Sequence, residues 1–545
     1  MSQRPGALRN GKDVRPEFAD PRGWFALDYI RQHGHWILFF VIVVIGVFAR
    51  VWEFGRVPPG LNPDEASIAV EAYSLLHFGV DRNGMSYPVQ FIAWGDGQSV
   101  PYSYLMMPGI ALAGHLSPTI IRLPILITGI LSLPLVYLVG KWTWDRRLGL
   151  LAMFFLAISP WHIVLSRWAL DANLLPFAFV AGFVCLLASA RDGKWFVATC
   201  AIFALCLYTY ATAYAVVPVF MALVLLINWR TRTVGRRPMI LGLISFAVIA
   251  APMALFLFVN TAHLNTLKLG PVTIPRYPVT PRYETQTLIQ TSDQTETWLT
   301  NLATASSLLW SQSDGFVQNT VEPYGYFYGI TLPIAVLGMI ILADRVGHQG
   351  HSWEAALLLA WIAAALIMAL FLPVNTNQFN VVFIPIIICM ALAIFWLSLR
   401  APWVLPLSVA ALIVAFAGFN LAYHGRAYRE AASSEFRAGI LPALRYASQT
   451  SPGPICVSAA SGQYIYVLYL QHPSPTSYLT NMKYDDPLSP TRNVLTLGRY
   501  TFGVGNCTGS SIWTYVLSKS DNLPRLGNRY DYKFFDNYVV YYPKQ

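Results

Sequence analysis

Long runs of apolar residues, separated by short polar segments, make up most of this chain. A helix that crosses a membrane needs about 20 mostly apolar residues, and a set of runs has roughly that length and character. They lie at residues 36–52, 119–140, 148–165, 172–190, 195–210, 212–228, 239–259, 325–343, 353–372, 379–398 and 402–420. The pattern predicts an α-helical polytopic membrane protein with about eleven transmembrane helices.

A further apolar run, residues 102–116, is shorter and contains Pro108, Gly109 and Gly114. If this run crossed the membrane, the basic loops after it would lie on the opposite side from the basic N-terminal tail. Polytopic proteins collect Lys and Arg in cytoplasmic loops, so we expect residues 102–116 to form an interfacial helix on the outer side. The cytoplasmic loops then carry Lys141, Arg146, Arg147, Arg191, Lys194, Arg230, Arg232, Arg236, Arg237, Arg345 and Arg400.

This topology also predicts the domain boundaries. Residues 1–35 form a cytoplasmic tail, residues 36–420 a transmembrane domain, and residues 421–545 a small extracytoplasmic α/β domain. Two large loops, 53–118 and 260–324, lie on the same outer side as that domain. We therefore expect a multi-pass protein of the plasma or inner membrane, surrounded by membrane lipids, whose functional site faces outward.

The C-terminal 125 residues alternate between helical and strand patterns. We expect helices at residues 426–447 and 463–471, and strands at 455–457, 511–517 and 532–542. Cys456 and Cys507 both lie in this region, and two cysteines outside the cytoplasm commonly oxidise. The sequence therefore predicts a Cys456–Cys507 disulfide; the alternative is two unrelated free thiols.

Composition supports this interpretation. Of the 545 residues, 55% are hydrophobic and only 12% are charged, whereas about a quarter of the residues of a soluble protein are charged. The formal net charge of +10 would suit a nucleic-acid partner, but cytoplasmic Lys and Arg account for it. We find no basic patch and expect no nucleic-acid binding.

Candidate chemistry begins directly after the first apolar run. Asn62, Pro63 and Glu65 form a helix-start pattern, in which Glu65 reaches back to cap the first turn. A helix from there would end near Gly79. Acidic residues at a helix N-terminus are favoured by the helix dipole without any catalytic role. If Glu65 serves the cap, however, Asp64 is left to point elsewhere and is the better catalytic candidate.

Further polar residues share this region. Arg122 stands at the outer end of the second apolar run, where an ionisable residue at membrane depth suggests a functional site, although snorkelling to the interface would also explain it. Asp171 lies at the same level, where an ion pair with Arg167 is the structural alternative. The candidate substrate-binding residues of the first outer loop are Arg56, Glu71, Asp96 and Tyr102.

Taken in order, several motifs make the chain resemble the GT-C glycosyltransferases, in the family-39-like group that includes protein O-mannosyltransferases and lipid A aminoarabinose transferases. The resemblance covers residues 36–420 in layout. The motifs are Asp64 with Glu65, GQSVPYSY at 97–104, IIRLP at 120–124, and the segment from Ser159 through Arg167 to Asp171.

The resemblance implies transfer of one sugar from a polyprenyl-phosphate donor to a protein, lipid or glycan acceptor. Asp64 matches the family's catalytic base, and Arg122 matches an arginine associated with the lipid phosphate. Glu65 would orient the acceptor or the backbone. A single base and a direct displacement predict inversion at the anomeric carbon.

The chain departs from the family at two places. Gln98 and Ser99 stand where lipid A enzymes have a lysine, and residues 375–380 are neutral where many bacterial relatives have an arginine. Phosphate binding would then be shared with Arg276 or Arg282.

The sequence leaves the cofactor and the activity class open. Asp64, Asp96 and Asp171 could hold a divalent metal ion, but no His/Cys spacing marks a site. A transporter or flippase of lipid-linked sugars would use a similar groove without a base. An outer-domain binding protein on an inactive scaffold is a third alternative.

Overall fold

The computed structural model describes residues 21–94, 96–280, 294–329, 331–348, 352–458, 462–488, 493–508, 512–519, 521 and 529–544. Residues 1–20 of the expected tail lie outside this part of the chain. The first helix, α1 (Pro21–Val51), begins well before residue 36, where the first span was predicted. The expected tail is therefore partly helical.

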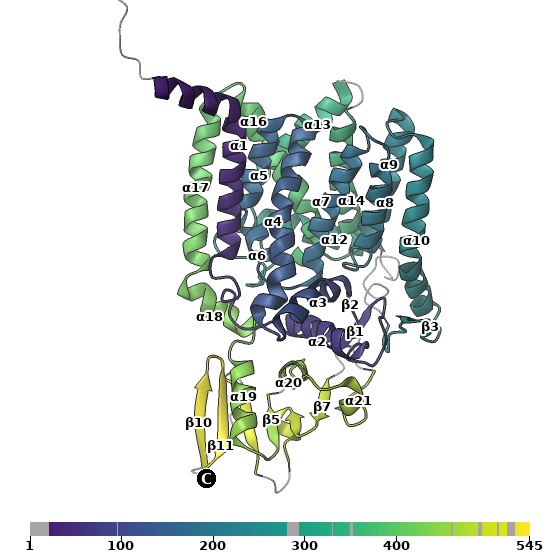
Figure 1. Ribbon diagram of the computed structural model, residues 1–545, viewed down its shortest axis with the longest axis vertical. Helices are drawn as coiled ribbons and strands as arrows, with labels where there is room; N and C mark the ends of the chain where they lie inside the picture. The colour runs from purple at the N-terminus through teal and green to yellow at the C-terminus, as the bar shows by residue number, and fades with distance from the viewer. Residues whose placement is uncertain are drawn as a thin grey trace, which may run out of the picture.

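The long helices pack side by side in a bundle, with a mixed sheet beyond one end of it (Figure 1). The start of α1 lies at the other end of the bundle. After α1, the helices of the bundle are α4 (Pro118–Thr143), α5 (Arg146–Ile158), α6 (Pro160–Leu165), α7 (Leu174–Ala188), α8 (Trp195–Cys206), α9 (Ala213–Thr231), α10 (Arg236–Thr261), α12 (Gln294–Ser311), α13 (Thr331–His348), α14 (Trp353–Phe371), α15 (Thr376–Phe379), α16 (Phe383–Ser398) and α17 (Val404–Tyr423).

Within the described residues, eight helices are long and apolar enough to cross a membrane. The chain is therefore an integral membrane protein, but the predicted count of eleven spans is not confirmed. The predicted span 148–165 is divided into α5 and α6, because Ser159 caps a new helix that begins at Pro160, and proline cannot continue the hydrogen bonding of the preceding helix. The predicted span 195–210 contains the 12-residue helix α8, which is about 18 Å long.

A layer of short elements separates the bundle from the sheet (Figure 1). It contains α2 (Pro63–Phe78), the hairpin β1 (Phe91–Ala93) and β2 (Asp96–Gln98), and α3 (Pro101–Ala113). Residues 102–116 therefore lie mainly in α3, which packs against α2 and α4, at the end of the bundle and not across it. A second hairpin, β3 (Leu267–Leu269) and β4 (Val272–Ile274), contacts this layer where the Val89 N–H donates to the Thr273 carbonyl.

The C-terminal region is built on a seven-stranded sheet in the order β10-β11-β9-β5-β8-β7-β6. Strand β5 runs parallel to its neighbours β8 and β9, and the remaining pairs are antiparallel. The strands are β5 (Ile455–Val457), β6 (Lys483–Tyr484), β7 (Val494–Leu497), β8 (Tyr500–Phe502), β9 (Thr514–Ser518), β10 (Tyr530–Phe535) and β11 (Tyr538–Pro543). The helices of this region are α18 (Arg426–Glu435), α19 (Ile440–Thr450), α20 (Tyr464–Gln471) and α21 (Pro475–Tyr478).

The helix predicted at residues 426–447 is interrupted between α18 and α19. Gly439 adopts a left-handed conformation, with φ of +92°, and a Cβ there would lie 2.0 Å from the Phe535 carbonyl oxygen. The break frees the Phe436 carbonyl to accept the Leu61 N–H at 2.6 Å. The interruption therefore joins the C-terminal region to the segment that precedes α2.

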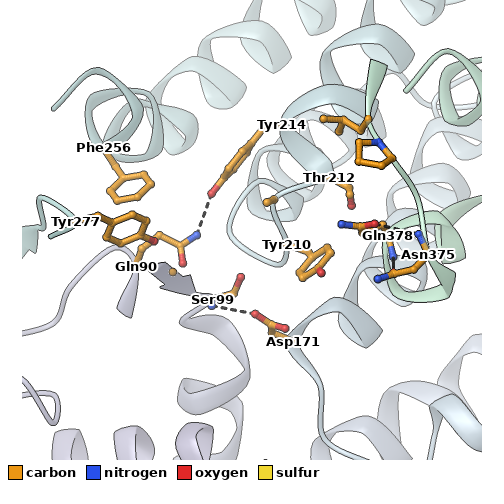
Figure 2. A pocket seen from close by; sticks show the side chains of 14 residues that line it. Gln90, Ser99, Asp171, Tyr210, Thr212, Tyr214, Phe256, Tyr277, Asn375 and Gln378 are labelled. Carbon is orange, nitrogen blue, oxygen red and sulfur yellow. Dashed lines mark hydrogen bonds between the residues drawn. The ribbon is translucent and has the colours of Figure 1, made fainter. Parts of the chain in front are cut away.

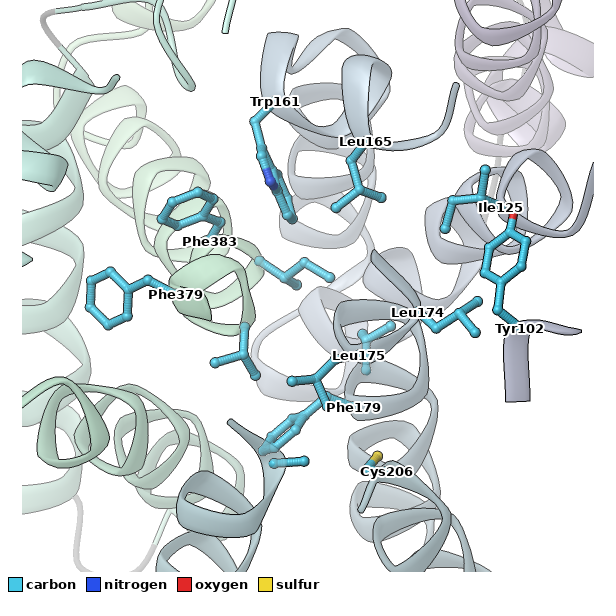
Figure 3. Packing of buried hydrophobic residues seen from close by; sticks show 14 of the residues in the cluster. Tyr102, Ile125, Trp161, Leu165, Leu174, Leu175, Phe179, Cys206, Phe379 and Phe383 are labelled. Atoms are coloured by element: carbon cyan, nitrogen blue, oxygen red, sulfur yellow. The ribbon is translucent and has the colours of Figure 1, made fainter. Parts of the chain in front are cut away.

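One continuous apolar core runs from the bundle into the sheet region. Trp161 and Phe383 meet edge to face in it, with ring centroids 5.1 Å apart, and Phe179 stacks on Trp361 at 4.7 Å. Figure 3 shows how side chains from α3, α4, α6, α7 and α16 converge there. Cys456 and Cys507 form a disulfide, with Cα atoms 5.9 Å apart, that joins β5 to the segment after β8.

Candidate active site

Asp64 is the second residue of α2, in a well-capped helix start. The Asn62 side chain accepts the Asp64 N–H at 2.9 Å, and the Glu65 carboxylate accepts the Asn62 N–H at 3.0 Å. Pro63 occupies the first helical position, where its missing N–H costs no hydrogen bond. The predicted capping box is therefore present and fixes the backbone that carries Asp64.

The Asp64 carboxylate is partly exposed and is held from the side by Trp94. The indole N–H of Trp94 donates to Asp64 Oδ1 at 3.0 Å. Trp94 stands in the turn of the β1–β2 hairpin with φ of +54°, and the Arg82 guanidinium lies 5.2 Å from its ring centroid. These contacts give the carboxylate a defined orientation.

The β1–β2 hairpin connects Asp64 to Asp171. The Gln98 amide lies 3.5 Å from the Asp64 carbonyl oxygen and accepts a hydrogen bond from the Ser67 hydroxyl. The next residue, Ser99, donates its N–H to Asp171 Oδ2 at 3.0 Å. Residues 97–104, singled out in the sequence, thus bridge two acidic side chains that are distant along the chain.

Asp171 lines a cavity of about 340 Å³, which we call the central cavity. Figure 2 shows side chains from several distant segments of the chain, among them Phe256 of α10, around this space. Its lining residues are Gln90, Gly97, Ser99, Asp171, Tyr210, Ala211, Thr212, Tyr214, Phe256, Tyr277, Leu372, Pro373, Asn375 and Gln378.

The chemistry of the central cavity is polar but nearly uncharged. Among its lining residues only Asp171 carries a formal charge. Asn375 and Gln378 cap α15 reciprocally, each side chain accepting the other residue's N–H at 3.0 Å. Gln90 donates to the Tyr214 hydroxyl at 3.0 Å. Amides and hydroxyls that both donate and accept suit a ligand rich in hydroxyl groups.

Tyr277 forms one wall of the central cavity. Its N–H donates to Asn260 Oδ1 at 2.8 Å, and its ring packs edge to face against Phe256. A Cβ on Gly97 would lie 1.8 Å from the Tyr277 hydroxyl, so only glycine allows this close approach. Tyr277 also lines an open groove of about 650 Å³ on its other side, together with Arg276.

The structure buries Glu65 and Arg122 against each other, so Glu65 orients backbone groups as expected and the Arg122 guanidinium is engaged by a carboxylate. Both side chains are fully buried, and Arg122 Nε and Nη2 donate to the two Glu65 oxygens at 2.7 and 2.8 Å. Arg122 also donates to the carbonyls of Pro58 and Gly60, and Glu65 accepts the Ala169 N–H. The pair holds three backbone segments together, so its polar groups are already occupied.

Tyr102 and Glu71 are also buried, and both form hydrogen bonds with other parts of the protein. The Tyr102 hydroxyl donates to the Ile121 carbonyl at 3.0 Å, and burial raises its pKa well above the usual range. Glu71 lies 3.0 Å from Arg82 Nε and accepts the Arg82 N–H. Burial raises the pKa of the Glu71 carboxyl. These residues support α2 and α3.

The remaining predicted residues are scattered. Arg56 is exposed in the turn after α1. Arg276 is exposed and lines the groove beside Tyr277. Arg282 and the side chain of Asp96 lie outside the described residues.

Arg167 does not pair with Asp171. It donates to the carbonyls of Ala49, Arg50 and Val57, and the Tyr423 ring lies 5.3 Å from its guanidinium.

Of the three predicted metal ligands, Asp64 and Asp171 have described side chains, whereas the side chain of Asp96 lies outside the described residues. Asp171 already accepts N–H groups of Ser99 and Ala172, and Asp64 accepts the Trp94 indole. Within the described part of the chain, no three His, Cys, Asp or Glu side chains lie close enough together to hold a metal ion.

Several cavity residues were not predicted as a site. Gln90, Tyr210, Thr212, Tyr214 and Tyr277 come from segments that are separated by up to 187 positions. These residues share no motif in the sequence that would have marked them as a site.

Comparisons with known proteins find one matching family and several similar structures. Residues 99–256 match the family described as dolichyl-phosphate-mannose-protein mannosyltransferase. The chain is similar in structure to ArnT from Cupriavidus metallidurans bound to undecaprenyl phosphate, with a TM-score of 0.56 and 14% sequence identity. The match covers 94% of this chain and 100% of the ArnT chain. No curated protein is significantly similar in sequence.

A second similar structure is longer than this chain. The archaeal oligosaccharyltransferase AglB from Archaeoglobus fulgidus, in complex with an inhibitory peptide and a dolichol-phosphate, is 14% identical with a TM-score of 0.50. The match covers 82% of this chain but 64% of AglB, so this chain spans less than two thirds of that protein. The chain therefore has the GT-C fold of these structures, and residues 99–256 are similar to the mannosyltransferase family.

Proposed function

We propose that this protein transfers a sugar from a polyprenyl-phosphate donor to a hydroxyl acceptor, with inversion at the anomeric carbon and Asp64 as general base. The observation that carries the proposal is the position of Asp64. Its partly exposed carboxylate is oriented by the helix cap and Trp94, and one hairpin connects it to a cavity lined by hydroxyl and amide groups.

The chemistry follows from these groups. A hydroxyl acceptor is a weak nucleophile near neutral pH, and a positioned carboxylate accelerates its attack by removing the proton. Asp64 accepts that proton while the acceptor oxygen attacks the anomeric carbon. The bond from that carbon to the phosphate oxygen breaks, and the electron pair leaves with the phosphate.

The central cavity supplies the sugar site in this proposal. Its amides and tyrosines would bind the hydroxyl groups of the donor sugar, and Asp171 would accept one of them. ArnT and AglB bind undecaprenyl phosphate and dolichol-phosphate, which supports a lipid-linked donor here. Because Arg122 is occupied by Glu65, we assign the donor phosphate to the groove beside Tyr277, where Arg276 is exposed.

The orientation in the membrane follows the distribution of basic residues. We propose that the end of the bundle bearing the C-terminal sheet faces outward, in the plasma or inner membrane. The acceptor, a protein, a lipid or another glycan, would then reach Asp64 from the extracytoplasmic side.

The Asp64→Asn substitution tests the catalytic proposal. Purified protein is incubated with a panel of polyprenyl-phosphate sugars and membrane-derived acceptors, and transfer is followed by mass spectrometry. Loss of the base should reduce the rate by about 10²–10⁴-fold without changing the melting temperature. Asp486→Asn, an exposed carboxylate in the C-terminal region, is the matched control and should retain full activity.

Two outcomes would contradict the proposal. If Asp64→Asn transfers sugar at a near-normal rate while remaining folded, Asp64 is not the base. If the unaltered protein moves lipid-linked sugars across vesicle membranes but transfers none, the protein is a transporter.

A further inference from the structure

The C-terminal region contains a second cavity, of about 180 Å³, which we call the C-terminal cavity. Its walls come from the start of α20 and from the segments that flank β6, β7 and β8. The residues that matter here are Gln463, Tyr464, Asp485, Asn493, Phe502 and Asn506. None of them belongs to the central cavity.

The C-terminal cavity has a buried floor and an exposed polar rim. Gln463, Tyr464 and Phe502 are buried, with exposures of 2%, 8% and 7%. Asp485, Asn493 and Asn506 are exposed around the opening. The floor offers aromatic carbon surface, and the rim offers planar amide and carboxylate groups.

One buried group in the floor, the side-chain amide of Gln463, suggests that the cavity holds a ligand. Gln463 Nε2 lies 3.4 Å from the Tyr538 hydroxyl, but Gln463 Oε1 has no hydrogen-bond partner among the described residues. Leaving a buried amide oxygen unpaired is costly, and such groups in native structures generally have a role. Gln463 lines the cavity, so a rotation of its amide would bring this buried oxygen to a hydroxyl donor of a bound molecule.

We infer that the C-terminal cavity binds a neutral sugar ring. Its volume suits one monosaccharide unit and is too small for a lipid or a folded peptide. Neighbouring hydroxyls of a sugar can donate to Gln463, Asp485 and the asparagine oxygens and accept from the asparagine amides. The apolar face of the ring would pack on Tyr464 or Phe502.

The C-terminal cavity also contacts the proposed active site through Trp94. The Trp94 and Tyr464 rings meet edge to face at 6.0 Å, and a Cβ on Gly462 would lie 2.8 Å from the Trp94 ring. The same Trp94 donates to Asp64. A sugar in the C-terminal cavity would therefore be separated from the proposed base by the Trp94–Tyr464 pair. This position would suit another sugar unit of a glycan acceptor. The binding site itself does not depend on the transfer reaction.

The test measures sugar binding to the full-length protein in detergent, by saturation-transfer NMR and calorimetry. The probes are D-mannose, D-glucose, D-galactose, L-arabinose and N-acetyl-D-glucosamine. We expect at least one to bind, and Asp485→Ala with Asn493→Ala to weaken it at least tenfold. Both substituted residues are exposed, so the fold should persist, as an intact disulfide would verify. Asn481→Ala, exposed and outside the C-terminal cavity, should bind normally.

Further variants and a competition experiment distinguish the possible results of this test. Gln463→Met, which removes the unpaired amide at similar volume, should also weaken binding about tenfold. Binding in the Asp64→Asn variant should be unchanged, which distinguishes this site from the reaction. Competition by cell-envelope glycan fragments would identify the sugar as part of a larger glycan, and its absence would identify a free sugar. If no sugar binds, or if the rim and Gln463 variants bind as tightly as the parent, the inference is wrong.

Discussion

Two neighbouring regions of this protein use polar residues in opposite ways. At the junction where α1, α2, α4 and α6 meet, Arg50, Arg122, Arg167 and Glu65 are all fully buried. A short distance away, the central cavity has a single charged residue, Asp171, among amides and tyrosines. The buried charges concentrate where they are paired with one another and with backbone carbonyls, and the lining of the central cavity is nearly neutral.

The contrast shows that charge at membrane depth is not in itself a sign of function. Arg50 donates to the carbonyls of Gly46, Ala157 and Leu156 and to His162. These contacts hold the first helix against the break between α5 and α6, and Arg167 and Arg122 join other backbone segments in the same way. Each guanidinium satisfies carbonyl groups that a loop buried near the membrane would leave unpaired.

The largest expected effect is at the junction. Glu65→Gln leaves Arg122 as a buried charge without its partner, and breaking a buried pair in this way costs about 3–5 kcal/mol. We expect a large fall in the melting temperature of the purified protein. Asp64→Asn, at the adjacent position, should melt like the parent. A Glu65→Gln variant that melts normally would remove the distinction between the two acids.

The second largest expected effect tests the role of the central cavity in sugar transfer. Gly97→Ala would place a Cβ 1.8 Å from the Tyr277 hydroxyl and displace the wall of the cavity. We expect kcat/KM for sugar transfer to fall about tenfold, which corresponds to about 1.4 kcal/mol, with little change in melting temperature.

Two controls accompany Gly97→Ala. Gly347→Ala, where an added Cβ meets nothing within 4 Å, should keep normal activity. The double variant Gly97→Ala with Tyr277→Ala should be no worse than Tyr277→Ala alone if the clash is the cause. Additive losses would show that Gly97 acts by another route.

The smallest effect concerns Arg276 in the groove. Arg276→Gln should raise KM for the lipid-linked donor several-fold and leave kcat nearly unchanged, because an exposed cation contributes about 1 kcal/mol or less. Arg56→Gln, an exposed arginine that does not line the groove, is the matched control. Equal KM values for the two variants would remove Arg276 from the donor site.

Local patterns predicted much of the layer around Asp64. Asn62, Pro63 and Glu65 specified the capped start of α2 because capping depends on residues within four positions of one another. The charges of distant loops predicted that residues 102–116 do not cross the bundle, since loop charge sets orientation, and α3 lies at the end of the bundle (Figure 1). Strand β5 was predicted with its observed bounds from a short buried pattern.

The structure differs from the sequence-based predictions at places where contacts between distant segments determine the local structure. Ser159 and Pro160 divide a run that looks continuous in hydropathy, and Gly439 breaks a helix so that Phe436 can pair with Leu61. Arg122 was expected at a lipid phosphate, because a sequence shows a charge but not whether Glu65 and two carbonyls already satisfy it.

By itself, the sequence determined the membrane class, the resemblance to GT-C enzymes and the separation of Asp64 from Glu65, because these depend on composition and on short spacings. Only the tertiary structure decided which polar residues face open space. The central cavity draws Gln90, Asp171, Tyr277 and Gln378 from four distant segments. Burial and pairing of polar groups depend on contacts between such segments, which no local pattern records.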